Sequence, residues 1–127
     1  MAWEMSNDRP IYIQLVERIM KQIASGGYKP GDRFPSVREL ALEAAVNPNT
    51  MQRAMAALET EGLLITSRTA GRTVTEDTAL IESVKTKIAT GEYEKFYSSM
   101  KELGYSDDEI VRFVCEAKPE AKKGGTL

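Results

Sequence analysis

Two helix-start signals lie close together in the first half of the chain, and they leave room for only a short helix and a tight turn between them. Glu39 follows Ser36 at the spacing of a capping box, which satisfies free amide groups at a helix start. Asn47 followed by Pro48 is the second signal, because asparagine is a favoured N-cap and proline suits the first helical position. The spacing therefore predicts one short helix beginning at Ser36 and another beginning at Pro48.

A longer helix is predicted before this pair. Apolar residues recur at every fourth position from Ile11 through Ile23, which is the buried stripe of an amphipathic helix, and the glycines at 26–27 end it. After the pair, residues 63–66 and 73–75 are rich in β-formers and flank a segment with a glycine and two arginines. That pattern predicts a β-hairpin with a basic tip, and the alternation at residues 3–6 predicts a short edge strand.

The helical pattern returns after residue 77. Its apolar positions, on both sides of a weak point at Gly91, are Leu80, Ile81, Val84, Ile88, Tyr93, Phe96, Tyr97, Met100 and Leu103. Ser106 with Glu109 is a second capping box and predicts a last helix through about Ala117. We expect residues 118–127 to form a disordered tail.

Composition restricts the function. The chain has 127 residues, 42% of them hydrophobic and 28% charged, as in an ordinary globular domain. It contains no histidine and a single cysteine, Cys115, so an internal disulfide, the common metal-ligand sets and the histidine-dependent nucleophile pairs cannot be built. We expect no catalytic residues, no metal and no cofactor, and we expect Cys115 to be a small buried hydrophobe. With no apolar run long enough for a bilayer and no secretory signal, we expect no membrane partner and a cytoplasmic location.

The predicted helix that begins at Pro48 has the features of a helix that reads DNA. Its apolar residues fall on one side, and Asn49, Gln52 and Arg53 fall on the other. Asparagine and glutamine side chains can pair with adenine in the major groove, and arginine can reach guanine or a phosphate. These three residues are candidate DNA contacts.

The neighbouring elements would contact the DNA backbone. The amino-terminal amides of the helix at Ser36, together with Arg38, can take a phosphate oxygen. No carboxylate is placed one helical turn after Arg38 to neutralise it. Arg68 and Arg72 of the hairpin would reach the flanking minor groove or its phosphates.

Four motifs in order resemble a known family. They are Pro-Ile-Tyr-Ile-Gln-Leu at 10–15, Gly-Tyr-Lys-Pro-Gly-Asp at 27–32, Pro-Ser-Val-Arg-Glu-Leu-Ala at 35–41 and Val-Asn-Pro-Asn-Thr-Met-Gln-Arg-Ala at 46–54. They resemble the GntR family of bacterial regulators, and the short helical remainder with Leu-Gly-Tyr-Ser at 103–106 resembles its YtrA-type subfamily. The resemblance implies DNA binding, and dimerisation by the carboxyl-terminal helices in place of a large effector pocket.

The resemblance also implies roles for matching positions. Arg38 matches the family's phosphate-contacting arginine, and Gly71 matches the glycine at the tip of the wing. The positions that match the recognition helix are Asn47, Asn49, Thr50, Gln52 and Arg53. The wing departs from the family's Arg-Arg-Gly-x-Gly-Thr-Phe-Val run, because this chain has Ser-Arg-Thr-Ala-Gly-Arg-Thr-Val at 67–74.

Aromatic residues gather in the carboxyl-terminal third. Two or three short helices cannot bury Tyr93, Phe96, Tyr97, Tyr105 and Phe113 alone, so a symmetric partner is the natural place for them. The residues that we assign to dimerisation are Ile81, Val84, Ile88, Tyr93, Phe96, Tyr97 and Met100.

The sequence thus predicts a mainly α fold with a small β-hairpin, namely a winged helix-turn-helix at 1–76 and a short α-helical dimerisation region at 77–117. The expected function is that of a homodimeric transcription regulator, a repressor on the family's pattern, that binds a double-stranded, pseudo-palindromic DNA operator. The net charge of −2 argues against a polyanion partner and favours the alternative of a winged-helix protein-interaction adaptor. A second alternative is a small-ligand sensor that uses the aromatic cluster, with an unknown effector.

Overall fold

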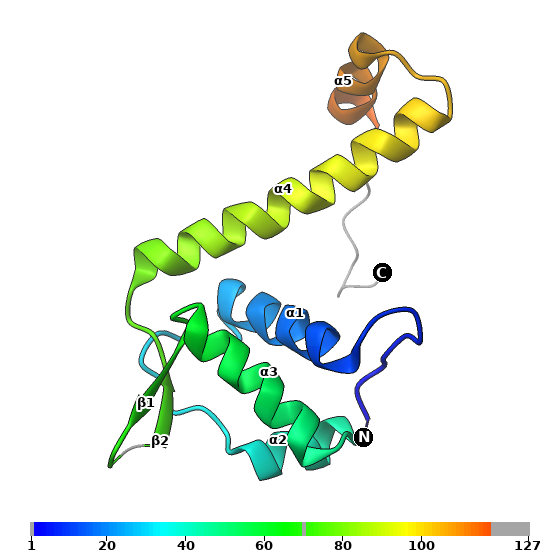
Figure 1. Ribbon diagram of the computed structural model, residues 1–127. Coiled ribbons are helices and arrows are strands. Elements are labelled where there is room, and N and C mark those ends of the chain that lie inside the picture. Colours follow the sequence, from blue (N-terminus) through cyan, green and yellow to red (C-terminus); the bar gives the residue numbers. More distant parts are fainter. Residues whose placement is uncertain (1, 70, 118–127) are drawn as a thin grey trace. The chain divides into compact units, whose positions relative to one another are not determined.

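The computed structural model describes residues 2–69 and 71–117 of the chain (Figure 1). Its elements are α1 (Ile11–Ala24), α2 (Val37–Ala44), α3 (Pro48–Thr60), β1 (Leu64–Ser67), β2 (Gly71–Val74), α4 (Thr78–Glu102) and α5 (Asp107–Glu116). The predicted fold class, mainly helical with one hairpin, is confirmed. The chain divides into two compact units at Ile88, within α4, whereas the functional boundary that we place at residue 76 stays a prediction.

The two helix starts of the first unit form as the sequence predicts. The amide of Glu39 donates to Ser36 Oγ at 3.1 Å, and the amide of Ser36 donates back to the Glu39 carboxylate at 2.9 Å. Between α2 and α3 the chain turns at Ala45, whose φ of 61° is in the left-handed region. Because a residue with a Cβ is strained there, this turn is held by the helices packed on either side of it.

The core of the first unit is formed by facing stripes of the helices. Leu15 and Ile19 of α1 are fully buried, as are Met51, Met55 and Leu58 of α3. α3 packs against both α1 and α2, and this packing sets the angle between the two short helices. Ile81, at the start of α4, also belongs to this core.

The hairpin is antiparallel, with Leu64 opposite Val74 at its base and Ser67 opposite Gly71 near its tip. The strands reach closer to the tip than the predicted 63–66 and 73–75, because the ladder of backbone hydrogen bonds continues through polar residues that the hydrophobic pattern does not mark. An isolated bridge from Arg33 to Thr73 ties the segment before α2 to the same hairpin.

The predicted strand at residues 3–6 is wrong, since these residues form no β ladder. The indole of Trp3 lies instead under the guanidinium of Arg18, 4.7 Å from the ring centroid, and its nitrogen donates to Glu43. Trp3 and Met5 pack against the helical core, so the alternation reflects one side of an extended segment lying on helices.

The second unit contains the rest of α4 and α5. Helix α4 continues through Gly91 without interruption, and the capping box of Ser106 with Glu109 starts α5 as predicted. Only Met100 and Ile110 are buried among its described hydrophobic residues. Cys115 is exposed, contrary to expectation, because α5 turns only Ile110 fully inward. The predicted tail at 118–127 lies outside the described residues.

Candidate nucleic-acid interface

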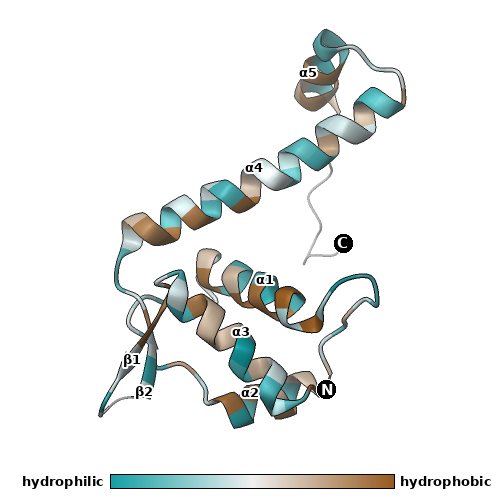
Figure 2. Cartoon of the chain, in the orientation of Figure 1, coloured by the Kyte–Doolittle hydropathy of each residue, from teal (hydrophilic) through white to brown (hydrophobic). Residues whose placement is uncertain are grey.

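The outer face of α3 presents the polar residues that the sequence singled out. Asn49, Gln52 and Arg53 are exposed, while the opposite face is sealed in the core. Figure 2 shows hydrophilic residues on the middle of α3. Thr50 is half-buried, and Asn47 caps the helix by accepting the amide of Asn49 at 2.7 Å. The side chains of Asn49 and Gln52 make no hydrogen bond within the described chain, so their amide groups are available to a ligand.

Arg53 is held by a residue that sequence reasoning missed. Its guanidinium carbon lies 3.8 Å from the centroid of the Tyr12 ring on α1, which is a cation–π contact. The stacking limits the directions in which Arg53 can extend. Nothing in the sequence indicates this pair, because α1 and α3 are brought together only by packing of the core.

Arg38 lies on the first turn of α2 and is exposed. Within the described residues it has no ion-pair partner, as its spacing from carboxylates predicts. An unpaired guanidinium at the amino-terminal end of a helix is suited to an anion, because the helix dipole adds to its positive field.

The two arginines of the wing have different surroundings. Arg68 is exposed and unpaired within the described chain. Arg72, which we expected at the DNA, has its Nε 3.0 Å from the Glu59 carboxylate of α3. Gly71 has a φ of 71° and open space around it, as the tip of a tight wing requires.

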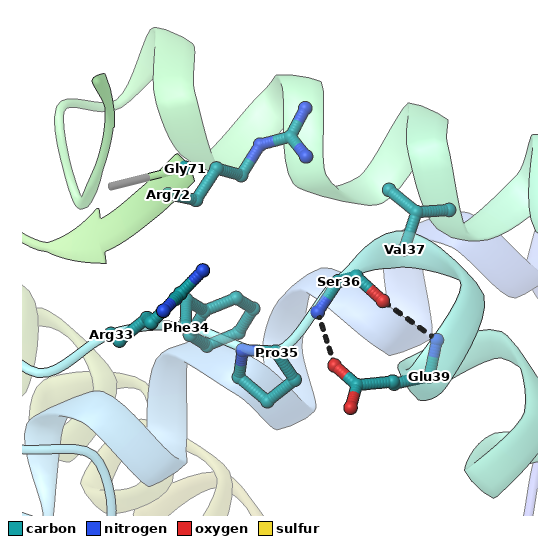
Figure 3. Close-up of a pocket in the computed structure, with 8 residues that line it drawn as sticks. All are labelled: Arg33, Phe34, Pro35, Ser36, Val37, Glu39, Gly71 and Arg72. Atoms are coloured by element: carbon teal, nitrogen blue, oxygen red, sulfur yellow. Dashed lines mark hydrogen bonds between the residues drawn. The ribbon is translucent and has the colours of Figure 1, made fainter. Parts of the chain in front are cut away.

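A cleft of about 570 Å³ lies between the wing and the start of α2 (Figure 3). Its lining residues are Arg33, Phe34, Pro35, Ser36, Val37, Glu39, Gly71 and Arg72. The amide of Phe34 donates to the carbonyl of Arg72 at 2.8 Å, which fixes one wall against the other. Arg33 was missed by sequence reasoning, because only the bridge to Thr73 brings it beside the wing.

The residues assigned to dimerisation have mixed surroundings. Ile81 and Met100 are buried inside their own units, and Val84, Ile88, Phe96 and Tyr97 are half-buried. Tyr93 is exposed. Other large hydrophobic side chains of the second unit that are exposed, and that the assignment omitted, are Leu103, Tyr105, Val111, Phe113 and Val114. Figure 2 shows hydrophobic residues on α5 among hydrophilic ones.

Two further features bear on other classes of function. Among residues 2–69 and 71–117, no cluster of cysteine, aspartate or glutamate side chains is arranged to hold a metal ion. In the same part of the chain, no helix combines the length and the apolar character needed to cross a membrane.

A short helix, a tight turn and a second helix with a free polar face, followed by a two-stranded wing, define a winged helix-turn-helix protein of the DNA-binding class. Similarity to known proteins identifies the family within this class. The family model described as bacterial regulatory proteins, gntR family, matches residues 11–74. The chain belongs to the GntR family of DNA-binding transcription regulators.

The relatives support the YtrA-type subfamily. The HTH-type transcriptional repressor YtrA of Bacillus subtilis is 37% identical over 122 residues, which are 91% of this chain and 89% of the relative. The structure of a GntR family transcriptional regulator from Listeria monocytogenes is similar with a TM-score of 0.81 and 40% identity, covering 91% of this chain and all of that one. These relatives are regulators, not enzymes.

The similar structures include complexes with operator DNA. The DNA-binding domain of AraR in complex with operator ORX1 matches with a TM-score of 0.53 and 25% identity, covering 59% of this chain and 95% of that domain. That domain therefore binds an operator with a fold similar to the one described here.

Proposed function

We propose that this chain is a homodimeric repressor that binds a pseudo-palindromic operator through the outer face of α3. The exposed polar face formed by Asn49, Gln52 and Arg53 carries the proposal, because amide and guanidinium groups match base edges in the major groove. The name of the Bacillus relative, a transcriptional repressor, supports the direction of regulation.

Backbone contacts would set the position of this face on the duplex. Arg38 at the start of α2 and Arg68 on the wing are exposed cations, and each can neutralise a phosphate. In this arrangement the net charge of −2 is no obstacle, because the field that a phosphate meets is local.

Selection of bound duplexes from a random pool, followed by affinity measurements, tests the proposal. Arg38→Ala should weaken binding to all duplexes and reduce the log–log salt slope by about 0.9. Gln52→Ala should relax the preference at one base position, at a cost of about 1–3 kcal/mol. Lys85→Ala, an exposed cation on α4, is the matched control and should leave both quantities unchanged. Absence of any salt-dependent duplex binding would favour the adaptor function instead.

Dimerisation would place two copies of α3 on one face of the duplex, one helical turn of DNA or a multiple apart. The exposed apolar residues of the second unit support a symmetric partner, because so small a unit buries only two hydrophobic residues by itself among those described. Val114→Glu on α5 should shift the sedimentation mass toward one chain and weaken operator binding. Lys85→Glu, a control at an exposed position on α4, should preserve the dimer.

A further inference from the structure

Three parts of the first unit meet at the carboxylate of Glu59. Glu59 lies in the last turn of α3, the Arg72 guanidinium approaches it from β2 at 3.0 Å, and the Thr66 hydroxyl donates to it from β1. Thr66 and Arg72 are directly opposite each other in the ladder. One carboxylate therefore holds both strands at the same level of the hairpin.

The position of this contact determines what it can control. Leu64 and Val74 bury the base of the hairpin in the core, and an isolated two-stranded hairpin is marginally stable without such packing. Toward the tip, the pair Thr66 and Arg72 comes immediately before the last pair, Ser67 and Gly71. A tether at that level fixes the direction of the outer half of the wing.

We propose that Glu59 and Arg72 form a clasp that orients the wing on the recognition helix, and that Arg72 is a positioning residue and not a phosphate contact. This inference rests on the proposed DNA binding by α3 and the wing. The Arg72 and Glu59 side chains are only 21% and 27% exposed, so the two charges neutralise each other away from bulk solvent. Figure 3 shows the Arg72 side chain extending from β2 toward α3.

The ionisation of Glu59 is consistent with a permanent clasp. The hydrogen bond from Thr66 lowers the pKa of the Glu59 carboxyl below its usual value, and Arg72 lowers it further against the opposing effect of burial. Glu59 therefore stays charged at neutral pH. Arg68, which is exposed on the wing, is left as the cation that can release a counterion from DNA.

Salt-dependent operator binding separates a clasp from a phosphate contact. Arg68→Gln should reduce the log–log slope by about 0.9, while Arg72→Gln should weaken binding roughly three- to tenfold without changing the slope. Glu59→Gln should weaken binding to the same extent, and the double variant should bind no worse than either single variant. If Arg72→Gln instead reduces the slope as Arg68→Gln does, and Glu59→Gln strengthens binding, Arg72 leaves Glu59 for a phosphate and the proposal is overturned.

The free protein supplies a test that does not need an operator. The Arg72 Nε–H donates to Glu59, so its NMR signal should exchange slowly with water in the wild type and in Arg68→Gln, and rapidly in Glu59→Gln. Equal exchange in the wild type and Glu59→Gln refutes the clasp. If the wild type binds no duplex while the Arg72 signal is protected, the proposed function fails and the clasp stands.

Discussion

Replacing Asn47 by alanine separates the structural role of this residue from a contact with DNA. Asn47 is the N-cap of α3, and its side-chain oxygen accepts the amide of Asn49 at 2.7 Å. It also occupies a position that matches the recognition helix of the GntR family. Its two roles make different predictions for alanine and for serine, which can cap a helix but lacks the amide group.

The stability that the alanine variant loses depends on how many backbone amides at this helix start lose their hydrogen-bond acceptor. Pro48 has no N–H, and the amides of Thr50 and Met51 donate to the backbone carbonyl of Asn47, which alanine keeps. Only the amide of Asn49 loses its partner, and Asn47 is exposed, so water can replace that hydrogen bond. We therefore expect a loss of about 1 kcal/mol in the free energy of unfolding, well below the upper limit near 2 kcal/mol for caps. A loss of that size corresponds to a decrease of roughly 3–5 °C in Tm.

Urea unfolding and operator affinity should be measured on the wild type, Asn47→Ala and Asn47→Ser. If the residue is only a cap, the serine variant retains both stability and affinity, and the alanine variant loses stability alone. If Asn47 also reads DNA, the serine variant is stable but binds more weakly. An alanine variant within about 0.3 kcal/mol of the wild type would refute the capping argument, since the cap would then contribute nothing.

Four other experiments test the same structure. Ala45→Gly should raise the free energy of unfolding by about 0.5–1 kcal/mol in urea titrations, because glycine relieves the left-handed φ of 61°. Tyr12→Leu and Arg53→Ala, combined in a double-mutant cycle, should show a coupling of about 0.5–1 kcal/mol, and full additivity would exclude the cation–π contact. The Ser36 amide lowers the pKa of Glu39 below its usual 4.5, so the wild type should exceed Glu39→Gln in stability near neutral pH; the difference should disappear as acid titrations pass below the lowered pKa. Leu58→Ala should lower the free energy of unfolding by about 2–5 kcal/mol, because the side chain is fully buried. Thermal unfolding of this variant should therefore occur at a lower temperature than that of the wild type.

Local signals in the sequence are strong enough to place most of the elements. Ser36 with Glu39 and Asn47 with Pro48 start their helices through hydrogen bonds to residues two or three positions away, so neighbouring residues alone determine them. The stripe from Ile11 to Ile23 predicts α1 for a similar reason, since it reports one face of one helix. The polar positions on the other side of α3 were predictable in the same way.

The sequence by itself determined the helices, their order and the polar face of α3, because these depend on contacts within a few residues or on a simple period. The tertiary structure alone decided which arginines of α3 and the hairpin have partners. Arg53 meets Tyr12, and Arg72 meets Glu59, only after core packing brings α1, α3 and the hairpin together. The segment at residues 3–6 could not be assigned from sequence for the same reason. Its alternation of apolar and polar residues suits both a strand at a sheet edge and an extended segment lying on helices, and only the packing of Trp3 against the core shows that it is the extended segment.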